Sequence, residues 1–426
     1  MQKFIVTGGA PLRGEVRIAG AKNAVLKLMA ASVLSDQPSV LRNVPRISDV
    51  MIMRETMGDI GFDVKRVGSD ALRITATDAS WLFVPLEAAA KMRASFILLG
   101  PLLARFGRVI ISNPGGDRIG RRPVDLHVAA MESLGAEIEY KNGYYFASAP
   151  RGLRGATITF PYVTVMGTEN ALLAATLARG STVIENAAQE PEVDDLIAML
   201  CSMGARIERV APHRLEIEGV SSLGGTDHTV IGDRLEAGTF AIAAAVTGGD
   251  VTVRGVVREH LASFLDVLDC MGVPVESLPA SEADAGALRV RAAERYEPAD
   301  VETAPYPGFA TDLQAPLAVL LTQADGVSTI HETIYEDRLD YSVELGKMGA
   351  VVEVLDERHL RVAGPTPLHG REVTIADLRA GATLVLAALA ASETSVISGV
   401  EHVDRGYERI EAKLVALGAQ IHRIDA

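Results

Sequence analysis

The sequence has few of the residues that mark secreted, disulfide-rich or membrane proteins. Its 426 residues include two cysteines, Cys201 and Cys270, and one tryptophan. Two thiols cannot build a disulfide framework, so a reducing compartment is expected. No apolar run approaches the roughly 18 residues that a membrane helix requires. The first residues also lack the charged and apolar regions of a signal peptide. We therefore expect a soluble protein of the cytoplasm that does not bind membranes.

Positive charge is also scarce. The chain carries 41 Lys and Arg against 55 Asp and Glu, a formal charge of −14, which argues against nucleic acid as a partner. The nine histidines show no metal-type pairing, and no GxxxxGK[ST] loop is present, so no metal site is expected. With 48% hydrophobic residues, a chain of this length should fold into two or three globular domains.

What the sequence does contain is a sixfold repeat. A helix-ending Met, Leu or Ile, then a glycine and a short β-branched strand, recur at intervals of 68–77 residues. The glycines are Gly61, Gly135, Gly204, Gly272, Gly349 and Gly418. Glycine adopts the left-handed conformation that ends a helix before a strand begins. Each repeat therefore should contain a helix that stops at its glycine.

Each repeat also contains a strongly apolar helix. These helices are expected at residues 24–34, 93–104, 169–178, 239–246, 312–321 and 382–391. A helix that is apolar on all sides is buried on all sides, so sheets should pack around interior helices, in two domains of three repeats each. A second, amphipathic helix follows, as at residues 194–203. Cys201 and Cys270 fall on such helices, where buried structural thiols are expected.

Polar or charged residues precede the apolar helices. Lys22, Arg93 and Arg379 are among them. Helix N-termini attract anions, so two groups of them facing a cleft would hold a polyanionic ligand. Any single one of these residues also fits a simple helix cap. Residues 114–127 are rich in glycine, proline and charge, which is typical either of a mobile lid that closes on phosphate or of a solvated turn.

Several motifs then make the chain resemble the enolpyruvyl transferases, in the branch that acts on UDP-N-acetylglucosamine. They are GAKNA (20–24), RAS (93–95), Gly120 with RPVDLH (122–127), ENAA (185–188), EPE (190–192), Pro307 with TD (311–312), ETI (332–334) with Arg338, DLR (377–379) and DRGYERI (404–410). The resemblance covers nearly the whole chain.

The resemblance implies an α/β fold, a two-domain inside-out α/β barrel built from six βαβαββ-type repeats, three per domain. Residues 22–232 would form the first domain, with a mobile loop near 112–122. Residues 1–21 and 233–426 would form the second domain. The implied reaction transfers the enolpyruvyl group of phosphoenolpyruvate to the 3-hydroxyl of UDP-N-acetylglucosamine through a tetrahedral ketal and releases phosphate, a step of peptidoglycan precursor synthesis. It needs no cofactor and no obligate protein partner.

The resemblance also implies roles for single residues. Lys22, Arg122 and Arg405 would bind phosphoenolpyruvate, with Arg379 nearby, and Asp312 would orient and deprotonate the sugar hydroxyl. The remaining substrate-binding residues would be Asn23, Arg93, Pro123, Val124, Asp125, Leu126, Tyr162, Val163, Thr164, Val165, Ile334, Arg338 and Asp377.

Asp117 stands where the family usually has a loop cysteine. As the general acid it would need a pKa well above its reference value of about 3.9. Loss of water on loop closure favours such a rise, and Arg118 and Arg122 oppose it. Lys22 is the competing proton donor.

Two other functions stay open from the sequence. One is enolpyruvyl transfer to a different acceptor, such as another nucleotide. Shikimate 3-phosphate is a weaker candidate, because the Gly-Ser-Lys-Ser opening of that enzyme is absent. The other function is that of a catalytically silent relative that binds a UDP-sugar.

Overall fold

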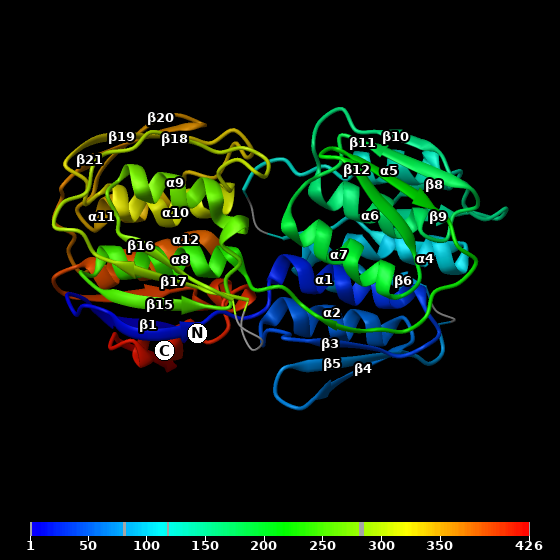
Figure 1. The fold of residues 1–426 in the computed structure, drawn as a ribbon, viewed down its shortest axis with the longest axis horizontal. Coiled ribbons are helices and arrows are strands. Elements are labelled where there is room, and N and C mark those ends of the chain that lie inside the picture. Colours follow the sequence, from blue (N-terminus) through cyan, green and yellow to red (C-terminus); the bar gives the residue numbers. More distant parts are fainter. Residues whose placement is uncertain (1, 80–81, 117–118, 281–284, 426) are drawn as a thin grey trace. The chain divides into compact units, whose positions relative to one another are not determined.

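The computed structural model describes residues 2–79, 82–116, 119–280 and 285–425. The chain forms two compact units (Figure 1). Unit 1 contains residues 1–19, 117–121 and 232–426, and unit 2 contains residues 20–116 and 122–231. The domain limits inferred above, 22–232 and 1–21 with 233–426, stay a prediction.

Six four-stranded sheets share one pairing pattern. In each, a short edge strand runs parallel to its neighbour, and the other strands pair antiparallel. Unit 2 has the sheets β14 (Asp227–Thr229), β3 (Ser39–Arg42), β5 (Ala71–Ala76), β4 (Phe62–Val67); β6 (Phe83–Val84), β7 (Arg108–Ser112), β9 (Tyr144–Ser148), β8 (Glu137–Lys141); and β10 (Thr157–Thr159), β11 (Ser181–Glu185), β13 (Arg214–Glu218), β12 (Arg206–Ala211). Unit 1 has β22 (Glu372–Thr374), β23 (Thr394–Ser398), β1 (Gln2–Thr7), β24 (Gln420–Asp425); β2 (Arg13–Arg17), β15 (Asp250–Arg254), β17 (Ala287–Arg291), β16 (Val275–Leu278); and β18 (Val301–Glu302), β19 (Gly326–His331), β21 (His359–Gly364), β20 (Val351–Asp356).

The first strands of the chain belong to unit 1. β1 lies between β23 and β24, so the N-terminal strand completes the repeat that the C-terminal residues begin (Figure 1). β2 pairs with β15, whereas β14 pairs with β3. The strands beside the chain crossings at residues 19–20 and 231–232 are therefore paired with distant segments. This non-local pairing leaves no trace in the local sequence pattern.

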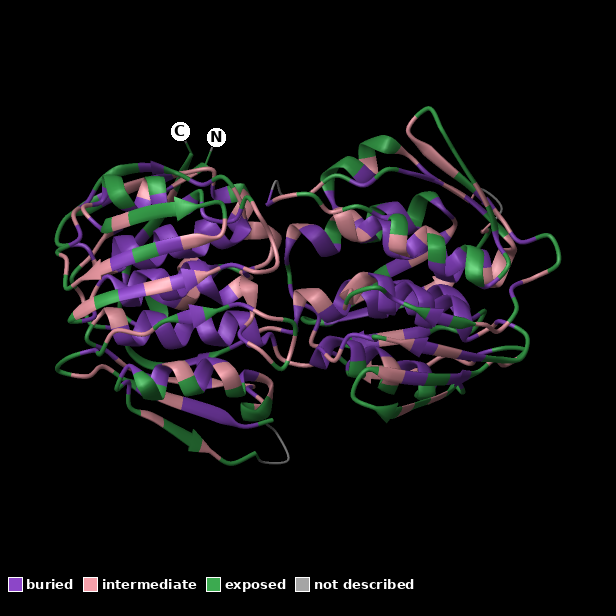
Figure 2. Cartoon of the chain, turned by 90° about the horizontal axis from the view of Figure 1, so that it is seen from above, coloured by how far each residue is buried: buried purple, intermediate pink, exposed green. Residues whose placement is uncertain are grey.

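Three interior helices fill each unit, as the apolar pattern predicted. They are α1 (Lys22–Ala31), α4 (Leu99–Phe106) and α6 (Val165–Ala175) in unit 2, and α8 (Arg234–Val246), α10 (Thr311–Leu321) and α12 (Leu378–Ala390) in unit 1. Their residues are nearly all buried (Figure 2). Short 3₁₀ helices extend α1 at its C-terminus (η1, Ser32–Leu34) and α4 at its N-terminus (η2, Arg93–Leu98). Because all six repeats have this arrangement, the predicted fold class is confirmed.

Three interior helices begin four or five residues earlier than predicted. α6 starts at Val165, α8 at Arg234 and α12 at Leu378, because the side chains of Thr164, Asp233 and Asp377 accept hydrogen bonds from the first free N–H groups. Such caps extend a helix beyond its apolar stretch. Hydrophobic periodicity alone could not mark these starts.

The outer helices are amphipathic. They are α2 (Ser48–Asp59), α5 (Asp125–Ser133), α7 (Pro191–Ser202), α9 (Ala262–Cys270), α11 (Tyr341–Lys347) and α13 (Ile410–Ala416), with α3 (Leu86–Lys91), η3 (Arg258–Leu261) and η4 (Val400–Arg405) as shorter pieces. The prediction of buried thiols was wrong, since Cys201 and Cys270 are exposed. Both lie in the last turn of their helices. None of the helices in the described ranges combines the length and apolarity needed to cross a bilayer.

The six repeat glycines all have positive φ, between 77° and 105°. The prediction that each ends a helix in the left-handed conformation is confirmed for all six. Gly204 is a clear position at which to measure the energetic cost of replacing such a glycine. A Cβ there would meet no atom within 4 Å, so only the backbone conformation opposes the substitution.

We expect Gly204→Ala to destabilise the protein by roughly 1–2 kcal/mol, since a left-handed residue with a Cβ is strained. The matched control is Gly58→Ala, an exposed position inside α2 where a Cβ would also meet nothing within 4 Å and φ is not positive. It should stabilise by about 0.4–1 kcal/mol through the unfolded state. Urea unfolding measures both. If both variants changed the free energy of unfolding by the same amount in the same direction, the left-handed conformation of Gly204 would not be the cause.

Candidate active site

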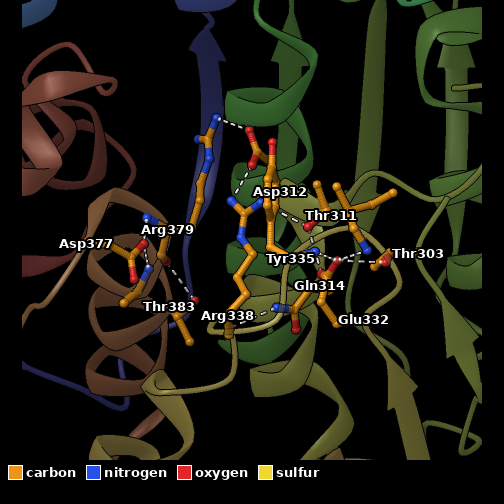
Figure 3. A network of polar contacts seen from close by, with 12 residues as sticks. Thr303, Thr311, Asp312, Gln314, Glu332, Tyr335, Arg338, Asp377, Arg379 and Thr383 are labelled. Atoms are coloured by element: carbon orange, nitrogen blue, oxygen red, sulfur yellow. Dashed lines mark hydrogen bonds and ion pairs between the residues drawn. The ribbon is translucent and has the colours of Figure 1, made fainter. Parts of the chain in front are cut away.

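Asp312 is the centre of a buried charge cluster in unit 1. It lies in the first turn of α10, and its two carboxylate oxygens take one guanidinium each. Oδ2 accepts from Nη2 of Arg379 at 2.9 Å, and Oδ1 accepts from Nη2 of Arg338. Figure 3 shows both guanidinium groups pointing at this carboxylate. The arginine side chains are 5–6% exposed and that of Asp312 is 21% exposed. Two cations thus share one directly bonded carboxylate.

Glu332 fixes the Arg338 side of this cluster. It is fully buried at the end of β19, and it accepts from the hydroxyls of Thr303 and Thr311 and from the backbone N–H of Ile334 and Tyr335. Thr311 in turn accepts from Arg338 at 2.9 Å. Figure 3 shows this chain of contacts. Arg338 is therefore held by a rigid, fully bonded partner.

The Arg379 side ends on a neutral group. Nη1 of Arg379 donates to the Tyr407 hydroxyl at 2.9 Å, and that hydroxyl lies 2.9 Å from Oγ1 of Thr239. Thr239 belongs to α8, Arg379 to α12 and Asp312 to α10. The N-terminal parts of all three interior helices of unit 1 thus meet in one network. Within this unit, the convergence of helix N-termini is as the sequence suggested.

The pairing decides the charge of Asp312. Burial by itself would raise the pKa of its carboxyl, but Arg379 and Arg338 outweigh that effect and hold the pKa far below its ordinary value. A carboxylate bonded in this way stays ionised. It can accept a hydrogen bond, but it is a poor proton acceptor while both guanidinium groups remain.

In unit 2 the predicted residues form two further contacts. Nζ of Lys22, at the start of α1, lies 3.0 Å from Oδ2 of the buried Asp49 on α2. Arg93, at the start of η2, donates from Nη2 to the carbonyl of Pro123 at 3.0 Å and to that of Arg122. Arg93 thereby fixes the backbone that precedes α5. The predicted residues Arg93, Arg122 and Pro123 are thus brought together.

A histidine lies beneath this backbone. His127 is buried, and its Nδ1 is 3.0 Å from the Asn170 amide, which also donates to the carbonyl of Phe96. Burial and, to a smaller extent, the charge of Arg93 lower the pKa of His127 to about 3. The imidazole is therefore neutral and accepts from Asn170. It serves as a packing and hydrogen-bonding group of the core.

A second buried charge cluster surrounds Glu169 on α6. The residue is completely buried, its carboxylate lies 3.5 Å from Nζ of Lys27, and neither oxygen has a hydrogen-bond partner among the described residues. Burial raises its pKa to about 7, Lys27 opposes the rise, and Glu192 and Glu190 at the start of α7 add to it. Glu169 therefore titrates near neutrality.

The other predicted residues occupy helix ends and loops. Thr164 caps α6 by accepting from Gly167 N–H at 3.4 Å, and Asp377 caps α12. Tyr162 is exposed, and Arg405 ends η4 two residues before Tyr407. The remaining predicted residues are placed as follows: Asn23 at the start of α1, Val124 to Leu126 before or in α5, Val163 and Val165 before or in α6, and Ile334 after β19. Asp117 and Arg118 lie outside the described residues.

The next residues of this loop, Gly120 and Arg121, belong to unit 1 and lie against Glu336 of the same unit. The backbone N–H of Arg121 donates to Oε1 of Glu336 at 2.8 Å. A Cβ on Gly120, whose φ is +121°, would come within 2.7 Å of Oε2 of the same carboxylate. Only glycine permits this close approach. Glu336 therefore anchors the end of the glycine-rich segment.

Sequence reasoning missed several of these groups. Glu332 and Tyr407 lie inside motifs noted above, and Glu336 lies between the ETI motif and Arg338, but nothing in their spacing indicated a role. Asp49 gave no signal beyond its place in the first turn of a helix. A search for buried acidic residues next to the predicted cationic residues would have found Glu332 and Asp49. Among the described residues, no group of three or more His, Cys, Asp or Glu is arranged to hold a metal ion.

The Glu169 cluster makes a prediction about stability and pH. The folded pKa of about 7 exceeds the ordinary 4.5, so the folded state binds the extra proton between these values. The stability of the wild type should fall as the pH rises through that window. Glu169→Gln removes this dependence, so the variant should gain about 2–3 kcal/mol relative to wild type between about pH 5 and pH 8.

Urea unfolding at both pH values measures this difference. Glu132→Gln on α5 is the matched control, because Glu132 is exposed and in the same unit. It should show no such change with pH. If the difference in unfolding free energy between Glu169→Gln and wild type were the same at both pH values, Glu169 would not titrate in this window.

Comparisons with known proteins agree with this architecture. The family model for EPSP synthase (3-phosphoshikimate 1-carboxyvinyltransferase) matches residues 6–414. Among solved structures, the enolpyruvyl transferase NikO from Streptomyces tendae aligns with a TM-score of 0.89 at 27% identity, over 100% of this chain and 99% of that chain. EPSP synthase from Acinetobacter baumannii shares the fold, with a TM-score of 0.77 at 17% identity over 100% of both chains.

Two curated relatives are more similar in sequence. A protein of Anaeromyxobacter dehalogenans (strain 2CP-1 / ATCC BAA-258) is 48% identical over 427 residues, and one of Solibacter usitatus (strain Ellin6076) is 45% identical over 425 residues, with 100% of each chain covered. Both are named UDP-N-acetylglucosamine 1-carboxyvinyltransferase. The chain therefore belongs to the EPSP synthase family of enolpyruvyl transferases that its motifs resemble.

Proposed function

We propose that the chain transfers the enolpyruvyl group of phosphoenolpyruvate to the 3-hydroxyl of UDP-N-acetylglucosamine and releases phosphate, a step of peptidoglycan precursor synthesis. The observation that carries this proposal is the identity of 45–48% along the full length of relatives named for that reaction. The location in the cytoplasm and the lack of an obligate protein partner, both expected from the sequence, remain predictions.

The paired arginines of unit 1 support an anionic substrate. Arg338 and Arg379 share a single carboxylate, and Nε of Arg338 is buried with no hydrogen-bond acceptor among the described residues. A planar guanidinium matches the geometry of carboxylate and phosphate oxygens. An enol phosphate carries both of these groups and would therefore suit a guanidinium such as that of Arg379.

The reaction can be written as addition followed by elimination. The sugar 3-hydroxyl gives its proton to Asp312, its oxygen forms a bond to C2 of phosphoenolpyruvate, and C3 takes a proton from Asp117 or Lys22. The product of this step is a tetrahedral ketal. Loss of a proton from C3 then restores the double bond as the C2–phosphate bond breaks. Lys22, Arg122 and Arg405 stabilise the departing phosphate.

The pairing of Asp312 adds a requirement. To accept a proton, Asp312 must first lose a guanidinium, because both of its oxygens are bonded. Arg379 is the one to move, because its other partner is a neutral tyrosine hydroxyl, whereas Arg338 is tied through Thr311 to the fully bonded Glu332. The arrival of an anionic substrate would draw Arg379 away and raise the basicity of Asp312.

The remaining predicted residues keep their proposed roles. The UDP-sugar would be held by Asn23, by the backbone that Arg93 fixes and by the capped start of α6 at Thr164. Ile334 of unit 1 would also bind it. The Ile334 N–H is already held by Glu332 at 2.8 Å, so its position is fixed before a ligand binds. Asp377 contributes indirectly by capping the helix that carries Arg379.

The acceptor is tested by phosphate release. We expect release from phosphoenolpyruvate with UDP-N-acetylglucosamine, and none with shikimate 3-phosphate or without an acceptor. Release only with another nucleotide would assign a different acceptor. Binding of UDP-N-acetylglucosamine without release, measured by calorimetry, would identify a silent relative. Either of the last two outcomes overturns the proposal.

Asp312→Asn tests the proposed base. We expect kcat to fall by about 10²–10⁴-fold, the usual contribution of general base catalysis. The KM for phosphoenolpyruvate should not rise, because the two arginines lose their internal anion and become more available. Steady-state kinetics with each substrate in turn provides both values. A large rise in that KM with little change in kcat would assign Asp312 to holding the arginines instead.

A further inference from the structure

Lys27 and Glu169 form a buried ion pair that no step of the proposed reaction uses. Lys27 lies on α1 and is 5% exposed, and Glu169 lies on α6 and is completely buried. Their charged atoms are 3.5 Å apart, and neither carboxylate oxygen of Glu169 accepts a hydrogen bond from a described residue. The geometry is that of a pair held at a distance by the packing of two helices.

Such a pair is a poor source of stability. Removing a carboxylate and an ammonium from water costs several kcal/mol each, and the attraction repays this only with close contact and further hydrogen bonds. Here the contact is long, and Glu190 and Glu192 add negative charge around Glu169. Apolar or neutral residues of similar size would serve the core at least as well. The pair therefore calls for an explanation other than stability.

Its location supplies one. Nζ of Lys27 donates to the backbone carbonyl of Asn23, one turn earlier on α1. Asn23 follows Lys22 at the start of this helix. Lys27 therefore restrains the peptide group beside a residue proposed to hold the UDP-sugar, and it does so from the side facing α6.

Glu169 has the matching position on α6. It lies about one turn after the N-cap Thr164 and the first helical residue Val165, which belong to the proposed nucleotide contacts. The neighbouring Thr168 accepts from the Ala188 N–H at 3.0 Å, and Asn170 accepts from the Gly100 N–H at 2.7 Å. The first turns of α6 are thus bonded on both sides of Glu169. The ion pair links them to α1 through charged side chains.

We propose that Lys27 and Glu169 are positioning residues for the acceptor: their ion pair holds the first turns of α1 and α6 at the spacing that the UDP-sugar requires. The inference rests on the proposed function for the identity of the acceptor. It assigns no chemical step to either residue. What it adds is that the geometry of the acceptor site in unit 2 depends on two residues buried beneath it.

The test replaces both members, so that no charge is left buried alone. Lys27→Met with Glu169→Gln keeps the approximate volumes and the net charge of the pair. We expect the Kd for UDP-N-acetylglucosamine, measured by calorimetry without phosphoenolpyruvate, to rise about tenfold, since binding would have to order the two helix starts. The melting temperature should stay the same or rise. Weaker binding without a lower melting temperature distinguishes a positioning role from structural damage.

The matched control is Lys65→Met with Asp63→Asn. This is an ion pair on β4 of the same unit, with the lysine side chain 73% exposed. Neither the Kd nor the melting temperature should change, because exposed pairs contribute little.

Two results would overturn the inference alone. One is an unchanged Kd in the buried double variant. The other is a weaker Kd accompanied by a clear drop in melting temperature. Wild-type protein that binds no UDP-N-acetylglucosamine would overturn the proposed function and the inference together, so the two failures can be told apart.

Discussion

The rest of the structure depends on the confinement of charge to the amino ends of helices that have no exposed face. Each unit is filled by three interior helices whose residues are almost all buried. Charged groups gather mainly where such a helix begins. There the free N–H groups and the helix dipole stabilise acidic side chains and bound anions, whereas basic side chains such as Lys22, Arg93 and Arg379 require carboxylate or carbonyl partners. A fold built from six of these helices therefore gathers its polar side chains at the helix starts, whatever their function.

The two units fill these helix ends differently. In unit 1 the cluster is a carboxylate between two arginines, tied through Thr311 to Glu332 and through Tyr407 to Thr239. In unit 2 lysines pair with Asp49 and Glu169, and the arginine Arg93 binds backbone carbonyls. The repeat thus determines the scaffold and where charge can be placed. Which charge stands there differs from repeat to repeat, and with it the chemistry that each unit can support.

This difference explains how far the sequence could predict the molecule. The periodicity of apolar residues identified the six interior helices, and the glycines identified where the repeats end, because both are local properties. The starts of α8 and α12 were missed, since a single capping aspartate decides them. The exposed Cys201 and Cys270 were missed for a related reason. A helix pattern shows which face is apolar, but a thiol near the helix end can face either side.

The site itself was out of reach of local reasoning. Asp312, Arg338 and Arg379 meet across three segments, and no spacing rule connects them. The resemblance named all three as candidates, yet it did not indicate that Asp312 is paired twice, nor that Glu332 stands behind Arg338. Those facts depend on side-chain geometry, which only the packed interior determines. They change the interpretation of Asp312 from a free base to one that must be released.

Asp312 and Glu169 show that burial alone does not determine the charge of a carboxyl group. Burial opposes ionisation of both, yet the pKa of Asp312 is lowered far below its usual value and that of Glu169 is raised to about 7. The cause is the number and distance of the donors. Asp312 is bonded by two guanidinium groups, whereas Glu169 has one lysine at 3.5 Å and two further glutamates nearby.

Consequently unit 1 carries a cluster whose charge is fixed across the physiological pH range, and unit 2 carries one whose charge varies within it. A fixed cluster suits a site that must attract an anion under all conditions. A variable one is tolerable only where, as with Lys27 and Glu169, the residues hold a geometry and take no part in the chemistry.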